Sequence, residues 1–190
     1  MSRLIVGRLS FIAVAIVAGA VRTERVAAQD TFADVRAVVE FQRAADSYAF
    51  LHRQAERRLG QAHRRDGQPA DSIRAAELAA AIVAERSSAP EGAVFTPPVA
   101  AAFRQLAGTA ARTPGCNPGE LRTGAWLVRQ VNSSAAGTTP VTRCIANALP
   151  ALPDELEYRS AGAVLVLVDS HANLIVDLLP ALLTGSDLRH

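Results

Sequence analysis

Residues 156–179, LEYRSAGAVLVLVDSHANLIVDLL, contain three short apolar segments separated by turn-forming residues. The segments 156–160, 163–169 and 174–179 are predicted to be strands. Residues 161–162 and 170–173 are expected to form the connections between them. The middle segment is apolar on both faces, so we expect a central strand that helices cover. This tail predicts a small three-stranded antiparallel sheet.

The chain before this sheet has the residue spacing of helices. Between residues 32 and 61, apolar side chains recur at alternating steps of three and four, which places them along one face of a long helix. A second helix is expected over 72–86. A third is expected to begin at Thr96-Pro97, an N-cap followed by proline at the first helical position. A fourth is expected around Trp126, and a short helical turn near Cys144.

The predicted fold is therefore α+β: an N-terminal bundle of about four helices followed by the small sheet. We expect residues 29–190 to form a single domain. Within it, residues 29–132 are expected to be mainly helical, and residues 133–190 to contain the short helical turn and the β-meander.

Residues 1–28 predict a cleavable secretion signal. Arg3 and Arg8 form a positive segment, and residues 9–21 are an uncharged apolar run of 13 residues. This run is shorter than the ~20 residues that a helix needs to cross a bilayer. We expect cleavage after Ala28, with Ala20 as a second possible site and an uncleaved anchor as a third interpretation. The protein is expected in the periplasm or outside the cell, without a stable transmembrane anchor.

The charge of the mature chain argues against a nucleic-acid partner. The whole chain has 20 basic and 18 acidic residues. The predicted signal holds four arginines and Glu24, which leaves 16 basic and 17 acidic residues, a net charge of −1. No basic stripe that could follow phosphates is expected. All the basic residues are arginine, so a phosphate-binding loop ending in lysine and a Schiff-base lysine are excluded.

Cys116 and Cys144 are the only two cysteines in the sequence. In an exported protein the expected state is a disulfide. Two free thiols are one alternative. A thiol-exchange site is another, against which stands the absence of a C-x-x-C motif.

The sequence also resembles a group of uncharacterised secreted proteins from GC-rich bacteria. The similarity lies in residues 149–159 (LPALPDELEYR), Gly162 and residues 165–177 (LVLVDSHANLIVD), and also in the helical part around residues 48–53 and 94–97. Where that group usually has a polar pair after the glycine, this chain has alanine and valine. The tail is more loosely similar to the ending of small periplasmic proteins of nickel and cobalt homeostasis. Neither likeness implies an activity.

The segment Asp169-Ser170-His171-Ala172-Asn173 carries the side chains best suited to chemistry. Carboxylate, imidazole and amide occur at steps of two, so they would share a face of an extended segment. They could hold a metal ion or supply a general base, and Asp177 could add a ligand. Asp and Asn also favour turns, so a capped strand connection is the other interpretation. The candidate metal ligands are Asp169, His171 and Asp177.

Other polar residues are interpreted as structural. His52 lies on the apolar face of the first helix near Tyr48, where we expect a core histidine bonded to a hydroxyl or a carbonyl, because no H-E-x-x-H motif is present. Glu155 and Glu157 could add carboxylate ligands. The arginines between residues 53 and 65 are interpreted as a solvated helix end, with an anionic envelope component as the alternative ligand.

These patterns contain no convergent set of nucleophile and base, and no catalytic residue and no cofactor are predicted. They favour a non-enzymatic protein of the cell envelope that binds or scaffolds another envelope component or protein. The alternative is a metal-binding protein or a metal-dependent hydrolase that uses Asp169 and His171.

Overall fold

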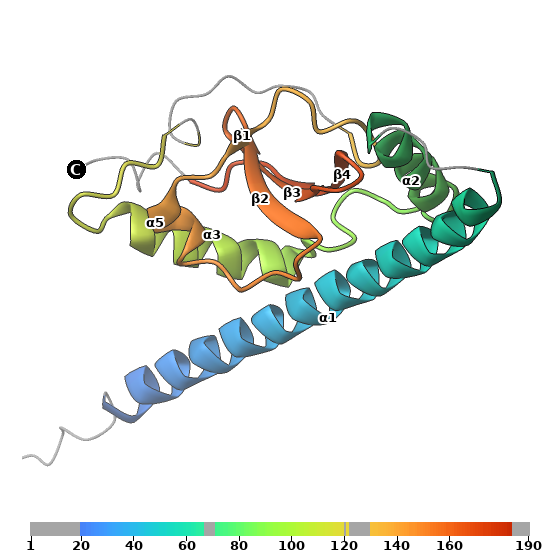
Figure 1. The fold of residues 1–190 in the computed structure, drawn as a ribbon. Helices are drawn as coiled ribbons and strands as arrows, with labels where there is room; N and C mark the ends of the chain where they lie inside the picture. The colour runs from blue at the N-terminus through green and yellow to red at the C-terminus, as the bar shows by residue number, and fades with distance from the viewer. Residues whose placement is uncertain (1–19, 67–70, 120, 122–129, 184–190) are drawn as a thin grey trace, which may run out of the picture. The chain divides into compact units, whose positions relative to one another are not determined.

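Helices precede an antiparallel sheet in the structure, which confirms the α+β prediction (Figure 1). The structure is a computed structural model that describes residues 20–66, 71–119, 121 and 130–183. The chain divides into two units, residues 1–33 and 34–190, and the sheet belongs to the second. In the described part of the chain, no helix has the length and apolar character needed to cross a membrane.

The helices form where the sequence predicts them. They are α1 (Ala20–Asp66), α2 (Asp71–Glu85), α3 (Pro97–Ala111) and the short α5 (Arg143–Ala146). Helix α1 is longer at both ends than the predicted range 32–61: no proline or glycine interrupts residues 20–59, and at the other end the helix continues past Gly60 to Asp66. Helix α3 begins with proline after Thr96, as predicted. The helix predicted around Trp126 lies outside the described residues.

The sheet contains four strands in the order β1-β2-β3-β4, all antiparallel. Strands β2 (Leu156–Ala161), β3 (Val164–Asp169) and β4 (Leu174–Leu179) confirm the three predicted strands within one residue. The additional strand β1 (Thr139–Pro140) has two residues, too few to show an apolar period, and it ends in proline. The prediction of three strands was therefore one strand short.

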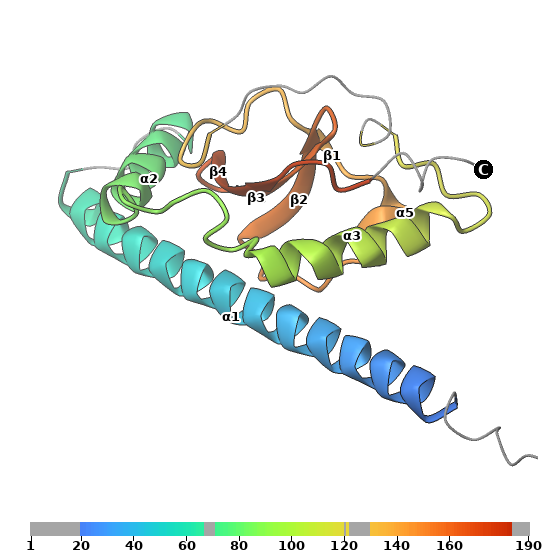
Figure 2. The ribbon, with the colours of Figure 1, turned by 180° about the vertical axis from the view of Figure 1, so that it is seen from behind.

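The two faces of β3 are buried in different apolar clusters. Leu165 and Leu167 pack with Phe41 of α1 and Phe103 of α3. The centroids of the two phenylalanine rings are 4.7 Å apart. Val166 on the opposite face belongs to a second, smaller cluster. Figures 1 and 2, which view the protein from opposite sides, both show α1 and α3 on the same side of the sheet. β3 is thus the central buried strand that the sequence predicts, with helices over one face.

The predicted disulfide joins Cys116 and Cys144, whose Cα atoms are 5.7 Å apart. Cys116 follows α3 and Cys144 lies in α5. The bridge therefore connects the end of the long helical region to the short helical turn that precedes the β2–β4 meander.

Candidate metal centre

The candidate site begins on the face that α1 directs at the sheet. Ala45, Tyr48, His52 and Ala55 are buried, and their spacing of three and four residues places them on one side of the helix. Glu56, one turn beyond His52, has a side chain that is 49% exposed. The helix thus carries an imidazole into the core and leaves a carboxylate next to it at the solvent boundary.

Asp169, the last residue of β3, meets this face of α1. Its Oδ2 accepts a hydrogen bond from the Tyr48 hydroxyl at 2.8 Å and lies 2.5 Å from His52 Nδ1. Burial alone would raise the pKa of Asp169, but hydrogen bonds from His52, the backbone of Ala172 and Tyr48, together with the charge of His52, outweigh burial and hold that pKa below its ordinary value. Asp169 is therefore a carboxylate, and Nδ1 of His52 carries the proton of their hydrogen bond.

The turn after β3 positions a second histidine. Asp169 Oδ1 accepts hydrogen bonds from the backbone N–H groups of His171, at 3.0 Å, and of Ala172, at 2.8 Å. Asn173 adopts a φ of 49°, in the left-handed region that asparagine tolerates. This is the capped strand connection that the sequence suggests. It brings the His171 ring to a centroid distance of 5.2 Å from the His52 ring, nearly edge to face.

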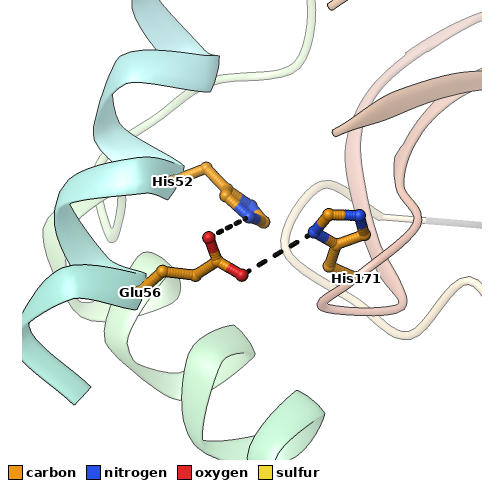
Figure 3. Close-up of side chains that lie close together, drawn as sticks. All are labelled: His52, Glu56 and His171. Carbon is orange, nitrogen blue, oxygen red and sulfur yellow. Dashed lines mark ion pairs between the residues drawn. The ribbon is translucent and has the colours of Figure 1, made fainter. Parts of the chain in front are cut away.

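The Glu56 carboxylate faces both imidazoles, one with each oxygen (Figure 3). Its Oε2 is 3.7 Å from His52 Nε2, and its Oε1 is 3.8 Å from His171 Nδ1. Both separations exceed an ordinary hydrogen bond, whose donor–acceptor distance is about 3 Å. The three side chains therefore approach one another without closing direct hydrogen bonds.

This spacing suits ligands arranged around an ion. His52, Glu56 and His171 each offer one ligand atom, and these atoms all lie within 4.8 Å of one another. Nitrogen and oxygen ligands about 2.1 Å from a tetrahedral zinc ion are about 3.4 Å apart. A small inward movement of exposed side chains would close the site around such an ion, because the Glu56 and His171 side chains are 49% and 51% exposed.

The electrostatics of the cluster favour a cation at His52. Burial alone would lower the pKa of His52, but the hydrogen bond and charge of Asp169, together with the charges of Glu56 and Glu155, outweigh it and raise that pKa above its ordinary value. These contacts therefore favour a proton on His52 when no metal is bound. A divalent ion would meet the same surrounding carboxylates.

Two buried side-chain atoms in the described part of the chain have no hydrogen-bond partner, His52 Nε2 and Glu155 Oε2. Buried polar atoms are rarely left unpaired in a folded protein, because the loss of their hydration costs about 1–3 kcal/mol each. Glu155 is close enough to His52 for their charges to influence each other's pKa. Both unpaired atoms therefore belong to the same region of the molecule.

The residues predicted as metal ligands do not converge on one point. His171 lies in the cluster, and Asp169 contacts the cluster through His52. Asp177 lies elsewhere, in β4 opposite Leu167 of β3 and next to a β-bulge in this strand pair. Its carboxylate accepts backbone hydrogen bonds from the 92–95 loop and from the next residue of β4. Asp177 thus anchors that loop to β4.

Two members of the cluster were not predicted as ligands. His52 is a bonded core histidine, as expected, but Nδ1 bonds the Asp169 carboxylate rather than a hydroxyl or a carbonyl, and Nε2 has no hydrogen-bond partner. Glu56 was not singled out at all. The signal that points to it is its position four residues after His52, since residues at that spacing share a helix face. Of the nearby arginines, Arg53 and Arg58 form ion pairs with Glu155 and Glu85.

Comparison with known proteins provides no template for this arrangement. No protein-family model matches the chain, and neither a curated protein nor a solved structure matches it. The function has to be argued from the cluster itself.

Proposed function

We propose that this protein binds a divalent transition-metal ion, zinc in the first place, through His52, Glu56 and His171. The observation that carries the proposal is the buried His52 Nε2, which has no hydrogen-bond partner and faces Glu56 (Figure 3). An ion at this position would pair that nitrogen and draw in the two half-exposed ligands.

The ligand set favours zinc over the hard cations. Two imidazoles and one carboxylate are typical of zinc sites, whereas calcium and magnesium prefer oxygen ligands only. Copper and nickel ions also bind imidazole, so which of these ions occupies the site also depends on which is available where the protein folds.

The surroundings of His52 also support a metal. A histidine ligand usually donates its second ring N–H to a carboxylate, which fixes the tautomer and makes the metal-binding nitrogen more basic. Asp169 has this position at His52 Nδ1, and the Tyr48 hydroxyl and two backbone N–H groups hold it in place. Asp169 is therefore proposed to support a ligand rather than to be one.

We further propose that the protein works outside the cytoplasm. The Cys116–Cys144 disulfide supports this location, because such bonds persist in oxidising compartments. The predicted secretion signal agrees with it. Binding of another envelope component, the other function suggested by the sequence, stays a prediction.

The test is metal analysis of the full chain, exported and purified without chelators. Elemental analysis should find one zinc ion per chain, and titration calorimetry on chelator-treated protein should give one binding site. His171→Ala and Glu56→Gln should each remove stoichiometric binding. Glu40→Gln is the matched control, because Glu40 lies on the same helix and bonds Thr96.

Failure of the proposal has a clear form. Folded protein that takes up no zinc, nickel, cobalt or copper would contradict it. So would unchanged zinc affinity in both His171→Ala and Glu56→Gln.

A further inference from the structure

Glu155 is a buried acid near the proposed metal site, but it is not one of the proposed ligands. It directly precedes β2 and is 8% exposed, and its Oε2 is the second of the two unpaired buried atoms. Burial alone would raise the pKa of Glu155, but its own backbone, the Arg53 ion pair and the charge of His52 hold it below the ordinary value. Glu155 is thus a carboxylate with one free oxygen.

Contacts with the neighbours of both histidines hold Glu155 in place. Its Oε1 accepts a hydrogen bond from Arg53 at 2.7 Å, and Arg53 directly follows His52. Its backbone oxygen accepts from the N–H and the hydroxyl of Ser170, which directly precedes His171. The carboxylate is therefore attached on one side to α1 and on the other to the turn that carries His171.

Glu155 is nevertheless not among the residues placed to bind the ion directly. The group whose ligand atoms all lie within 4.8 Å of one another contains His52, Glu56 and His171, without Glu155. A water molecule on the ion would reach a carboxylate beyond the ligands, since a zinc–oxygen distance of about 2.1 Å and a hydrogen bond of about 2.7 Å to a carboxylate add in series. Three protein ligands leave a fourth position on zinc open for that water.

We propose that Glu155 holds a water molecule on the bound ion and accepts its proton, so that the site hydrolyses carboxylic esters. This inference rests on the proposed metal binding. The water oxygen forms a bond to the acyl carbon, whose carbonyl the ion polarises, while its proton passes to Glu155 Oε2. The bond from the acyl carbon to the leaving oxygen then breaks, and Glu155 returns the proton to that oxygen.

The charges around the ion select the substrate class. Glu56, Glu155 and Asp169 contribute three negative charges, and Arg53 contributes one positive charge, so a divalent ion makes the group neutral overall. Zero net charge favours an uncharged substrate over a phosphate dianion, and an ester carbonyl requires no counter-charge. Glu56 and His171, which are half exposed, open the ion to the solvent side from which the ester would approach.

The first experiment measures hydrolysis by the zinc-loaded full chain. It should hydrolyse para-nitrophenyl acetate, and chelation should stop the reaction. Glu155→Gln should lower the rate by about 100-fold or more, the usual contribution of a general base, while one zinc ion remains bound. Glu155→Asp should recover part of the rate. Glu157→Gln is the control, because Glu157 pairs with Arg159 instead.

The second experiment needs no turnover. In the cobalt-loaded protein, azide should change the visible absorption spectrum, because it replaces water at an open coordination position. An unchanged spectrum would show a closed site and overturn the inference.

The outcomes separate the inference from the metal proposal. Stoichiometric zinc without ester hydrolysis overturns the inference and leaves metal binding intact, whereas absence of zinc overturns both. Full esterase activity of Glu155→Gln would contradict the proposed role of Glu155 as the general base. Hydrolysis of para-nitrophenyl phosphate in place of the acetate overturns the substrate class.

Discussion

The two ring nitrogens of His52 have different surroundings. Asp169 lies 2.5 Å from Nδ1, whereas Nε2 has no hydrogen-bond partner. Because a carboxylate can bond only to the nitrogen that carries a proton, this asymmetry leaves the lone pair of the neutral ring on Nε2. One side chain is thus both part of the core and a candidate ligand.

Asp169→Asn should weaken zinc binding by about 10- to 100-fold, the usual effect of losing the carboxylate behind a histidine ligand. The amide N–H introduced at position 169 would favour the His52 tautomer that has its proton on Nε2. A protonated Nε2 cannot bind a metal ion. Titration calorimetry measures the change. Asp177→Asn is the matched control, because Asp177 is equally buried but anchors the 92–95 loop. It should lower stability and leave zinc affinity unchanged, so an equal loss in both variants would contradict this role.

The stability of the metal-free protein should fall as the pH rises above about 6.5. The folded pKa of His52 exceeds its ordinary value of about 6.5, so its contribution is complete below that pH and is lost as the pH rises through the folded value. The folded pKa of Asp169 is below its ordinary value of about 3.9, so its contribution is present above that pH and is lost on acidification. Urea midpoints across this range test both trends.

Zinc binding should respond to pH in the opposite way on the alkaline side. A proton on His52 Nε2 competes with the ion, so zinc affinity should rise as that proton leaves. A metal-free midpoint that climbs steadily from neutral to alkaline pH would contradict the assignment of His52.

The sequence predicts only part of this site. Asp169 and His171 can be recognised because they lie two residues apart in one turn. Their convergence with α1 is a tertiary contact between residues 117 positions apart, and local periodicity contains no information on such contacts. This is why His52 could be placed in the core but not in a site, and why Glu56 was missed.

At the level of elements, the β3 end is joined to α1 by polar bonds inside an apolar interface. Tyr48 donates to Asp169, and the Arg86 guanidinium lies over the Tyr48 ring, 5.0 Å from its centroid. Burial, more than the nearby Asp169, raises the pKa of Tyr48, so its hydroxyl stays protonated as a donor. The interface between helix and sheet therefore also orients the candidate ligand.

Tyr48→Phe should destabilise the fold by about 1 kcal/mol, the typical net value of one buried hydrogen bond, and should also weaken zinc binding. Asp169 would lose one of the donors that orient it, while the ring contact with Arg86 remains. Tyr158→Phe is the control, because Tyr158 donates a similar bond to Pro150 away from the cluster. Chemical denaturation and zinc titration of both variants give the comparison. If the two variants lower zinc affinity equally, Tyr48 has no special role.

The elements themselves were largely predictable. Apolar runs and turn residues locate β2, β3 and β4 within a residue, and the Thr96-Pro97 start locates α3. Strand β1 was missed because only its pairing with β2 defines it as a strand, and two residues are too few to show an apolar pattern. The place of Asp177 in the β3–β4 register also has no local signal, so that residue was grouped with the turn by its residue type alone.

At the scale of the molecule, the β4 edge is covered by another part of the chain. Residues 132–135 bond to residues 173–175, and Ser134 pairs with Leu174 in an isolated bridge. An uncovered edge strand of this apolar character would be a template for aggregation. The segment thus protects the hairpin whose turn carries His171.

Removal of the disulfide should affect stability without affecting the candidate site. The bridge spans 28 residues, which corresponds to about 3.6 kcal/mol in the chain-entropy estimate. The double variant Cys116→Ser/Cys144→Ser should lose stability of this order in chemical denaturation. Its zinc affinity, measured where the variant is still folded, should match that of the parent. A large loss of zinc binding by folded variant would show that the bridge shapes the site.

The distance along the chain between the candidate ligands has a consequence for how the protein would acquire its metal. His52 and Glu56 lie in α1, whereas His171 comes after the third strand of the sheet, so a newly made chain has no complete site until most of it has been synthesised. An ion can be captured only after the helix and the last hairpin have met. Affinities for divalent metals follow a similar order at most sites, so the ion incorporated depends on local supply. If the chain is exported before it folds, as proposed, that supply is the one outside the cytoplasm.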